Sequence, residues 1–131
     1  MNVPYSPQRL AELIDGGIVL TREQEAVIAA PLTSRLVVAG AGSGKTFVMS
    51  MRVAYLVANR LVRPDAILGL TFTRKAAGEL NQRVRSMLAR LPVGLNGAEE
   101  PLWPTVSTYD AYASQVVRDH GLRIGVDPDA R

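Results

Sequence analysis

Short apolar runs alternate along this chain with longer segments in which apolar residues recur every three or four positions. Runs at 36–39 and 67–71 predict buried strands, and a third short strand is predicted at 105–107. The helical spacing predicts long helices over 45–60, 76–91 and 108–120. Two shorter helices are predicted before the first strand, one beginning at Ser6-Pro7 and one at Thr21 and ending at Pro31.

This order of strand, helix, strand, helix, strand and helix predicts an α/β fold with a parallel sheet, because parallel neighbours need crossover connections. Ligands of such sheets bind at the carboxyl ends of the strands. Those ends fall at 40–46, 71–75 and 107–110. We therefore expect three polar loops to lie along one edge of the sheet.

The composition is that of an ordinary globular domain, with 131 residues, 47% hydrophobic residues and no cysteine. Disulfides are therefore excluded. The amino-terminal residues lack the basic start and apolar run of a signal peptide, and no apolar run approaches the length of a membrane span. We expect a cytoplasmic protein with no membrane partner.

The positive charge is concentrated in one part of the chain. Residues 35–90 contain ten basic residues against two acidic ones, although the whole chain has a net charge of +3. Such a segment attracts polyanions such as nucleic acid, but a solvated arginine-rich surface explains the charge equally well. The chain has only two lysines, Lys45 and Lys75, and both fall inside the motifs described next.

Residues 39–46 read A-x-x-x-x-G-K-T, which differs at its first position from the phosphate-binding loop G-x-x-x-x-G-K-[ST]. The glycines let the backbone N–H groups turn inward around phosphate, and the helix that follows points its positive end at the same place. Lys45 would reach the β- and γ-phosphates as the candidate catalytic residue, and the Thr46 hydroxyl would ligate Mg²⁺. The alternative is a glycine turn with an incidental lysine. The candidate nucleotide-binding residues of the loop are Ala39, Gly40, Ala41, Gly42, Ser43, Gly44, Lys45 and Thr46.

Gln24 allows two interpretations. Thr21 and Gln24 have the spacing of a capping box, in which each side chain bonds the backbone of the other. The amide of Gln24 also has the donor and acceptor needed to read the edge of an adenine. Spacing alone favours the capping box.

Four segments, in this order, resemble the N-terminal motifs of UvrD/Rep-type superfamily 1 DNA helicases. They are "LTREQEAVIAAP", "VVAGAGSGKT", "LGLTFTRKAAGELNQRV" and "VSTYDAYASQVVRDHG", and they are similar to the Q motif, the Walker A motif, motif Ia and motif Ib. An alanine at the start of the phosphate loop is also usual in that family. The segment "LVRPDAILGLTFTRKAA" is similar to helicase–nuclease subunits of actinobacterial break-resection machines, which makes such a subunit a candidate partner.

The resemblance implies a P-loop NTPase fold, with a RecA-like parallel sheet and flanking helices, that is incomplete in residues 1–131. It implies that Gln24 contacts the adenine of ATP. It also implies that motif Ia, which has an aromatic ring, hydroxyls and cations, and part of motif Ib touch single-stranded DNA. Phe72 as a core residue and Arg74 and Lys75 as a solvated helical turn are the structural alternatives. The candidate DNA-binding residues are Thr71, Phe72, Thr73, Arg74, Lys75, Thr108 and Tyr109.

Two residues near these motifs receive structural roles instead. Asp110 is an acid facing a presumed DNA path, and we expect it to cap the helix that follows. Trp103 lies in a proline-rich loop and is expected to pack against the protein rather than to stack on a base.

Hydrolysis of ATP also needs an acid that helps to hold Mg²⁺, usually within an Asp-Glu pair at the end of an apolar strand. No such strand follows Thr46. We therefore expect the first part of an ATP-dependent DNA helicase that acts in DNA repair or recombination, inactive without the rest of the protein. One alternative is a stand-alone module that binds nucleotide or single-stranded DNA without turnover. Another is a small-molecule kinase, disfavoured because such kinases tend to begin almost at the phosphate loop.

Overall fold

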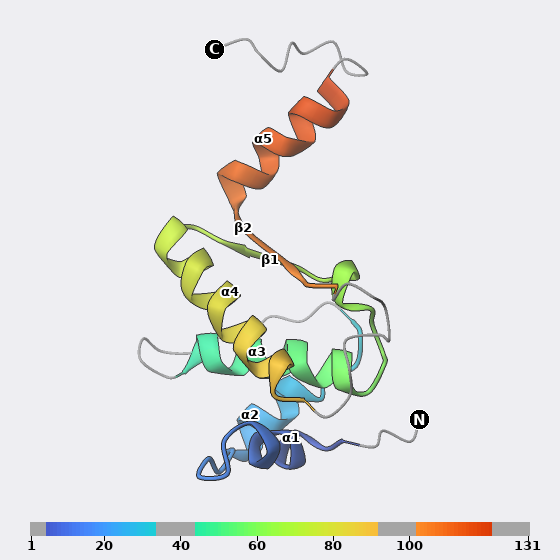
Figure 1. The fold of residues 1–131 in the computed structure, drawn as a ribbon, viewed down its shortest axis with the longest axis vertical. Helices are drawn as coiled ribbons and strands as arrows, with labels where there is room; N and C mark the ends of the chain where they lie inside the picture. Colours follow the sequence, from blue (N-terminus) through green and yellow to red (C-terminus); the bar gives the residue numbers. More distant parts are fainter. Residues whose placement is uncertain (1–4, 34–43, 92–101, 122–131) are drawn as a thin grey trace.

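The computed structural model describes residues 5–33, 44–91 and 102–121 (Figure 1). The described elements are α1 (Pro7–Ile14), α2 (Arg22–Ile28), α3 (Lys45–Ala58), the 3₁₀ turn η1 (Pro64–Ala66), β1 (Leu68–Thr71), α4 (Arg74–Ala89), β2 (Thr105–Thr108) and α5 (Tyr109–His120). The predicted strand at 36–39 lies outside the described residues.

The two described strands form a parallel pair. Leu68 is opposite Thr105 and Thr71 is opposite Thr108, so both strands end at the same edge. Helix α4 makes the crossover between them, as a parallel connection requires. The predicted parallel arrangement is thus confirmed for β1 and β2, while the complete RecA-like sheet stays a prediction.

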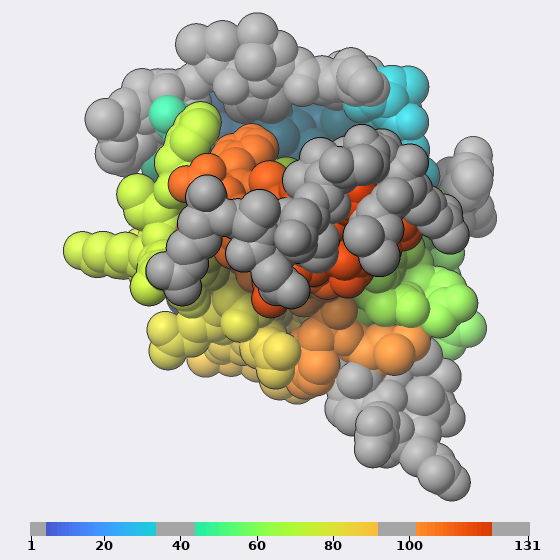
Figure 2. All heavy atoms as spheres, turned by 90° about the horizontal axis from the view of Figure 1, so that it is seen from above, coloured from blue at the N-terminus to red at the C-terminus, as the bar shows by residue number. Residues whose placement is uncertain are grey.

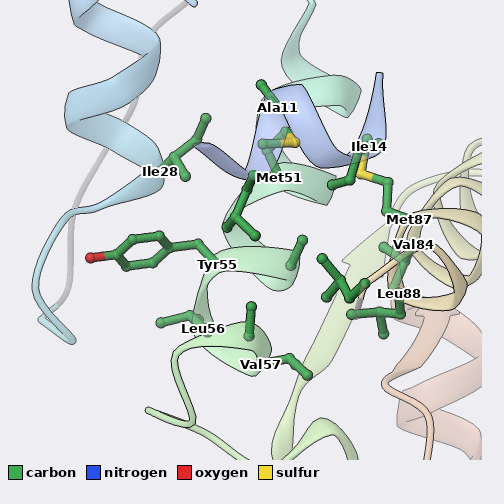
Figure 3. Close-up of a cluster of buried hydrophobic side chains, with 14 of the residues drawn as sticks. Ala11, Ile14, Ile28, Met51, Tyr55, Leu56, Val57, Val84, Met87 and Leu88 are labelled. Carbon is green, nitrogen blue, oxygen red and sulfur yellow. The ribbon is translucent and has the colours of Figure 1, made fainter. Parts of the chain in front are cut away.

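Helix α3 lies at the centre of the hydrophobic core. It packs against α1, α2 and α4, and Figure 3 shows its side chains between Ile28 of α2 and Val84 of α4. Met51 and Ala54 are fully buried on this helix. Burying a side chain the size of Met51 contributes roughly 1.5–3 kcal/mol. The core therefore holds in place the helix that begins at the end of the predicted phosphate loop.

The apolar stripe predicted on α4 is confirmed. Its members Leu80, Val84, Met87 and Leu88 are buried, as is Leu91 just beyond the helix. The helix begins where Thr73 accepts a hydrogen bond from the backbone N–H of Ala76, at 3.1 Å. This cap places the first turn of α4 directly after the end of β1.

The start of α1 is as predicted, with Ser6 as the cap and Pro7 in the first turn. Helix α3 ends at Ala58, two residues earlier than expected. Arg60 there has a left-handed φ of 56°, and the Leu61 N–H donates to the Leu56 carbonyl at 2.9 Å. This arrangement closes the helix, although glycine is the usual residue at the left-handed position.

Helix α5 follows β2 without a loop and extends away from the body of the molecule (Figure 1). None of its residues is buried. It ends at His120 as predicted, but Gly121 has a φ of −58° and does not use the left-handed freedom of glycine. None of the helices in the described residues combines the length and apolar character that a membrane crossing requires.

Candidate functional site

The first helical turn of α3 carries the end of the predicted phosphate loop. Gly44 precedes the helix with a φ of +77°, a left-handed conformation that favours glycine. Lys45 and Thr46 follow as exposed residues. The buried hydroxyl of Ser50 donates to the Thr46 carbonyl at 2.7 Å, which ties this turn to the next one. The other candidate loop residues, 39–43, lie outside the described residues.

The start of α3 is electrostatically suited to an anion. Gly44 provides no side-chain cap, and the first turn contains no acid. Backbone N–H groups at a helix start lack partners within the helix, and the aligned peptide dipoles make this end positive. Anions bind favourably at such an end. Lys45 adds a mobile positive charge at the same point.

Gln24 fulfils its structural role and also reaches the start of α3. Thr21 Oγ1 accepts from the Gln24 N–H at 3.1 Å, and Gln24 Oε1 accepts from the Thr21 N–H at 2.9 Å. The capping box is therefore confirmed. A Cβ built on Gly44 would lie 4.0 Å from Gln24 Nε2, so this amide nitrogen sits beside the glycine that opens α3. Within the described residues Nε2 donates no hydrogen bond, which leaves it available to a ligand.

A second candidate site lies where β1 and β2 end. The residue after β1, Phe72, is 88% exposed, and Tyr109 after β2 is 48% exposed. Their ring centroids are 5.1 Å apart with an interplanar angle of 37°. The interpretation of Phe72 as a core residue is therefore wrong. In Figure 2 the start of α4 (yellow-green) and the start of α5 (orange) lie side by side at the surface.

Threonine hydroxyls border this aromatic pair. Thr73 and Thr108 cap α4 and α5, accepting from Ala76 N and Ala111 N at 3.1 Å each. Because a hydroxyl used as an acceptor keeps its own proton, both can still donate to a phosphate oxygen. Thr71, in contrast, already donates to the Thr73 carbonyl, at 3.0 Å.

The expectation that Asp110 caps α5 is wrong. Thr108 is the capping residue, because its hydroxyl accepts a hydrogen bond from the Ala111 N–H at 3.1 Å.

 Thr108 itself has φ −79° and ψ 158°, the extended backbone that an N-cap requires, and it lies directly before the first helical residue. Asp110 lies inside the first turn, where its negative charge is favourable at the positive end of the helix.

Arg74 and Lys75 place two positive charges at the start of α4. Both are exposed, and neither forms a hydrogen bond or an ion pair with any residue that the structure describes. Positive charge at a helix start is mildly unfavourable without a counter-charge, because the dipole is positive there. The edge therefore combines two positive helix ends, an exposed aromatic pair and two cations that have no partner among the described residues, which suits a polyanion that carries bases.

Two contacts in the structure leave no signal in the sequence. The guanidinium carbon of Arg85 lies 4.7 Å from the ring centroid of Trp103, which is partly buried against the core as expected for a packing residue. Arg52 of α3 donates hydrogen bonds to the carbonyl of Ile28, the last residue of α2, and to the carbonyls of Ala30 and Pro31 that follow it. Neither contact leaves a periodic signal, because each joins residues more than 15 positions apart.

A cleft of about 690 Å³ lies away from both candidate sites. Its walls come from α2, α3, α4 and the two strands, and they include Val27, Met49, Leu80 and Val106. These side chains are apolar, and neither Lys45 nor Phe72 lines the cleft. No group of three or more His, Cys, Asp or Glu side chains suited to a metal ion occurs in residues 5–33, 44–91 and 102–121. Within these residues the candidate ligand-binding groups therefore lie at the helix starts rather than in the cleft.

A parallel β-α-β unit with polar residues at its strand ends, beside a helix that begins directly after Gly44, defines an α/β protein with a candidate ligand-binding edge. Residues 20–131 match the model of the family described as the UvrD/REP helicase N-terminal domain. The match covers most of the chain. The chain belongs to this family.

Individual relatives agree with the family match. The chain is 37% identical over 120 residues to DNA helicase II of Haemophilus influenzae, and 38% identical over 121 residues to ATP-dependent DNA helicase UvrD1 of Mycobacterium tuberculosis. It is 42% identical over 92 residues to ATP-dependent DNA helicase PcrA of Bacillus subtilis. These alignments cover 92%, 92% and 70% of the chain but only 15%, 14% and 11% of the relatives. The chain thus corresponds to a small part of each relative.

Proposed function

We propose that this chain is the ATP- and single-stranded-DNA-binding N-terminal segment of an ATP-dependent DNA helicase or translocase. The observation that carries the proposal is the edge formed by β1 and β2, with an exposed aromatic pair between two helix starts and two unpaired cations. The family membership supports the same assignment. DNA repair or recombination in the cytoplasm is the proposed setting, and a helicase–nuclease subunit is a proposed partner.

ATP would bind at the start of α3. In this proposal residues 39–44 surround the phosphates within a RecA-like P-loop fold, and Lys45 neutralises the β- and γ-phosphate charge. The Thr46 hydroxyl would hold Mg²⁺, which stabilises negative charge on the transferred phosphoryl group when it is bound. Gln24 would read the base. In support, its Nε2 lies beside Gly44 and donates no hydrogen bond within the described residues, while its oxygen holds the helix cap.

Single-stranded DNA would bind along the edge of the sheet. The Phe72 ring lies against the tilted ring of Tyr109, and the 88% exposure of Phe72 leaves room for a base to stack on it. Thr73 and Thr108 can donate to phosphate oxygens, and Arg74 and Lys75 supply the countercharge. Stacking does not depend on base identity, so this edge suits binding without sequence preference.

The test of this function uses the complete protein encoded by the gene. We expect it to hydrolyse ATP faster when single-stranded DNA is added, and to separate a duplex that carries a single-stranded tail. Both activities are measured with matched DNA lengths and with Mg²⁺ present. Nucleotide and DNA binding without any turnover would favour the stand-alone binding module instead. Hydrolysis that does not respond to single-stranded DNA would contradict the proposal.

Replacing Lys75 with alanine is expected to flatten the salt dependence of single-stranded DNA binding. One lost phosphate contact lowers the slope of log K against log salt by about 0.7. The slope is obtained from titrations at several salt concentrations. Arg63→Ala is the control, because Arg63 precedes β1 at the opposite end of the strand and pairs with Asp65 at 2.9 Å. An equal change in both variants would show that Lys75 has no specific contact.

A further inference from the structure

Arg52 connects α3 to the end of α2. Its Nη1 donates to the carbonyl of Ile28 at 2.9 Å and also to that of Ala30, and its Nη2 donates to the carbonyl of Pro31 at 3.3 Å. The Arg52 side chain is half-buried between the two helices. One guanidinium group therefore serves three carbonyl groups in the segment where α2 terminates.

Helix α2 is a short helix that gains stability from such a contact. It has seven residues, and a helix of this length is marginal in isolation. The last carbonyls of a helix lack partners within it, and α2 has no basic residue in its own last turn. A cation at this negative end is favourable, and its hydrogen bonds to carbonyl groups are charge-assisted. Arg52 therefore fixes the position of α2 on α3.

The opposite end of α2 carries Gln24. The Nε2 atom of Gln24 lies beside Gly44, directly before α3 begins. Arg52 lies on α3, two turns beyond that start. From Lys45 to Arg52 the axis of α3 rises by roughly 10 Å. Helix α2 thus lies along α3 with its Gln24 end near Gly44 and its Ile28 end held by Arg52. A change in the Arg52 contacts would tilt α2 and move the Gln24 amide.

We propose that Arg52 is a positioning residue that determines base selectivity, because it holds Gln24 where the amide can read the edge of adenine. This inference rests on the proposed function of the site as an ATP-binding site. Arg52 itself would touch neither the base nor the phosphates. Its loss should therefore lower the preference for ATP over GTP while the triphosphate is still bound.

The test compares ATP and GTP affinity in the complete protein carrying Arg52→Met. We expect the ratio of the GTP dissociation constant to the ATP dissociation constant to fall about tenfold, which is the effect of losing a base-edge hydrogen bond. The affinity for GTP should stay within about threefold of the wild-type value. Gln24→Ala should produce the same fall, and adding Arg52→Met to it should lower the ratio no further. Arg52→Gln, which keeps a polar donor without the charge, is the second variant if Arg52→Met does not fold.

The control is Asn59→Ala at the other end of α3. Asn59 accepts from the Tyr5 N–H at 2.9 Å and donates to the Tyr5 carbonyl at 3.0 Å, so its loss removes comparable contacts without touching α2. We expect lower thermal stability but an unchanged ATP preference. An unchanged ratio in the folded Arg52 variant would overturn the inference and leave the proposed function standing. A wild-type protein that binds neither nucleotide would instead contradict the proposed function.

Discussion

Replacing Lys45 with alanine is expected to remove nearly all affinity for Mg·ATP. Lys45 is the positive side chain at the start of α3, and the first turn of this helix contains no acidic residue that could pair with it. Truncating one member of a charged hydrogen-bonded pair costs about 2–5 kcal/mol, which corresponds to roughly a 30- to 4,000-fold rise in Kd. Calorimetric titration of the complete protein with Mg·ATP measures the change directly.

The fold should not change in this variant. Lys45 is exposed at the first helical position, and alanine is the best helix former, so the free energy of unfolding should move by no more than about 0.5 kcal/mol. Lys75→Ala is the matched control, because Lys75 also lies in the first turn of a helix but at the DNA edge. Wild-type ATP affinity in Lys45→Ala would show that the loop does not bind phosphate.

Local sequence signals predicted the elements well wherever a short-range contact determines the structure. Ser6 and Thr21 were recognisable as caps because their hydrogen-bond partners lie three residues further along. The stripe on α4 follows from the helical period alone. The parallel pairing of β1 and β2 followed from the crossover helix between them. The caps and the stripe depend on residues that are close in sequence, and the pairing depends on the order of the elements, so the sequence pattern contains the information.

Predictions of helix boundaries were less accurate where more than one nearby residue could cap or end the helix. Thr108 and Asp110 are both good capping residues, and the extended backbone that selects Thr108 follows from the end of β2. Arg60 adopts a left-handed conformation that the sequence does not indicate, because glycine or asparagine is usual there. At Thr108 the preceding strand β2 determines where the helix begins, and a single sequence does not reveal where that strand ends.

At the candidate site, too, features set by nearby residues were predictable and contacts between distant residues were not. The motif residues were identifiable, but the contact between Phe72 and Tyr109 joins residues 37 positions apart and follows only from the strand register. The two interpretations of Gln24 were treated as competitors, whereas the structure shows that they are compatible. Holding the cap with Oε1 directs Nε2 toward Gly44, so the structural role orients the group that would contact a ligand.

The aromatic pair of Phe72 and Tyr109 leads to a second prediction with a large expected effect, on DNA affinity. Phe72→Ala is expected to weaken single-stranded DNA binding by about 1–3 kcal/mol, or roughly 5- to 150-fold in Kd, because stacking of one base is lost. A fluorescence anisotropy titration with a labelled oligonucleotide at fixed salt measures the change. The loss should be similar for different base compositions, because stacking does not depend on hydrogen-bonding edges.

Phe72→Leu separates stacking from simple apolar contact. Leucine keeps an apolar side chain of similar reach but has no aromatic face, so most of the affinity loss should remain. Val116→Ala is the control, since Val116 is an exposed apolar residue on α5 and lies beyond the first turn that borders the edge. Phe72 is 88% exposed, so its replacement should change the unfolding free energy by no more than about 1.5 kcal/mol, the upper value for an aromatic pair. A large loss of thermal stability with unchanged DNA affinity would show that the ring supports the fold and not the DNA.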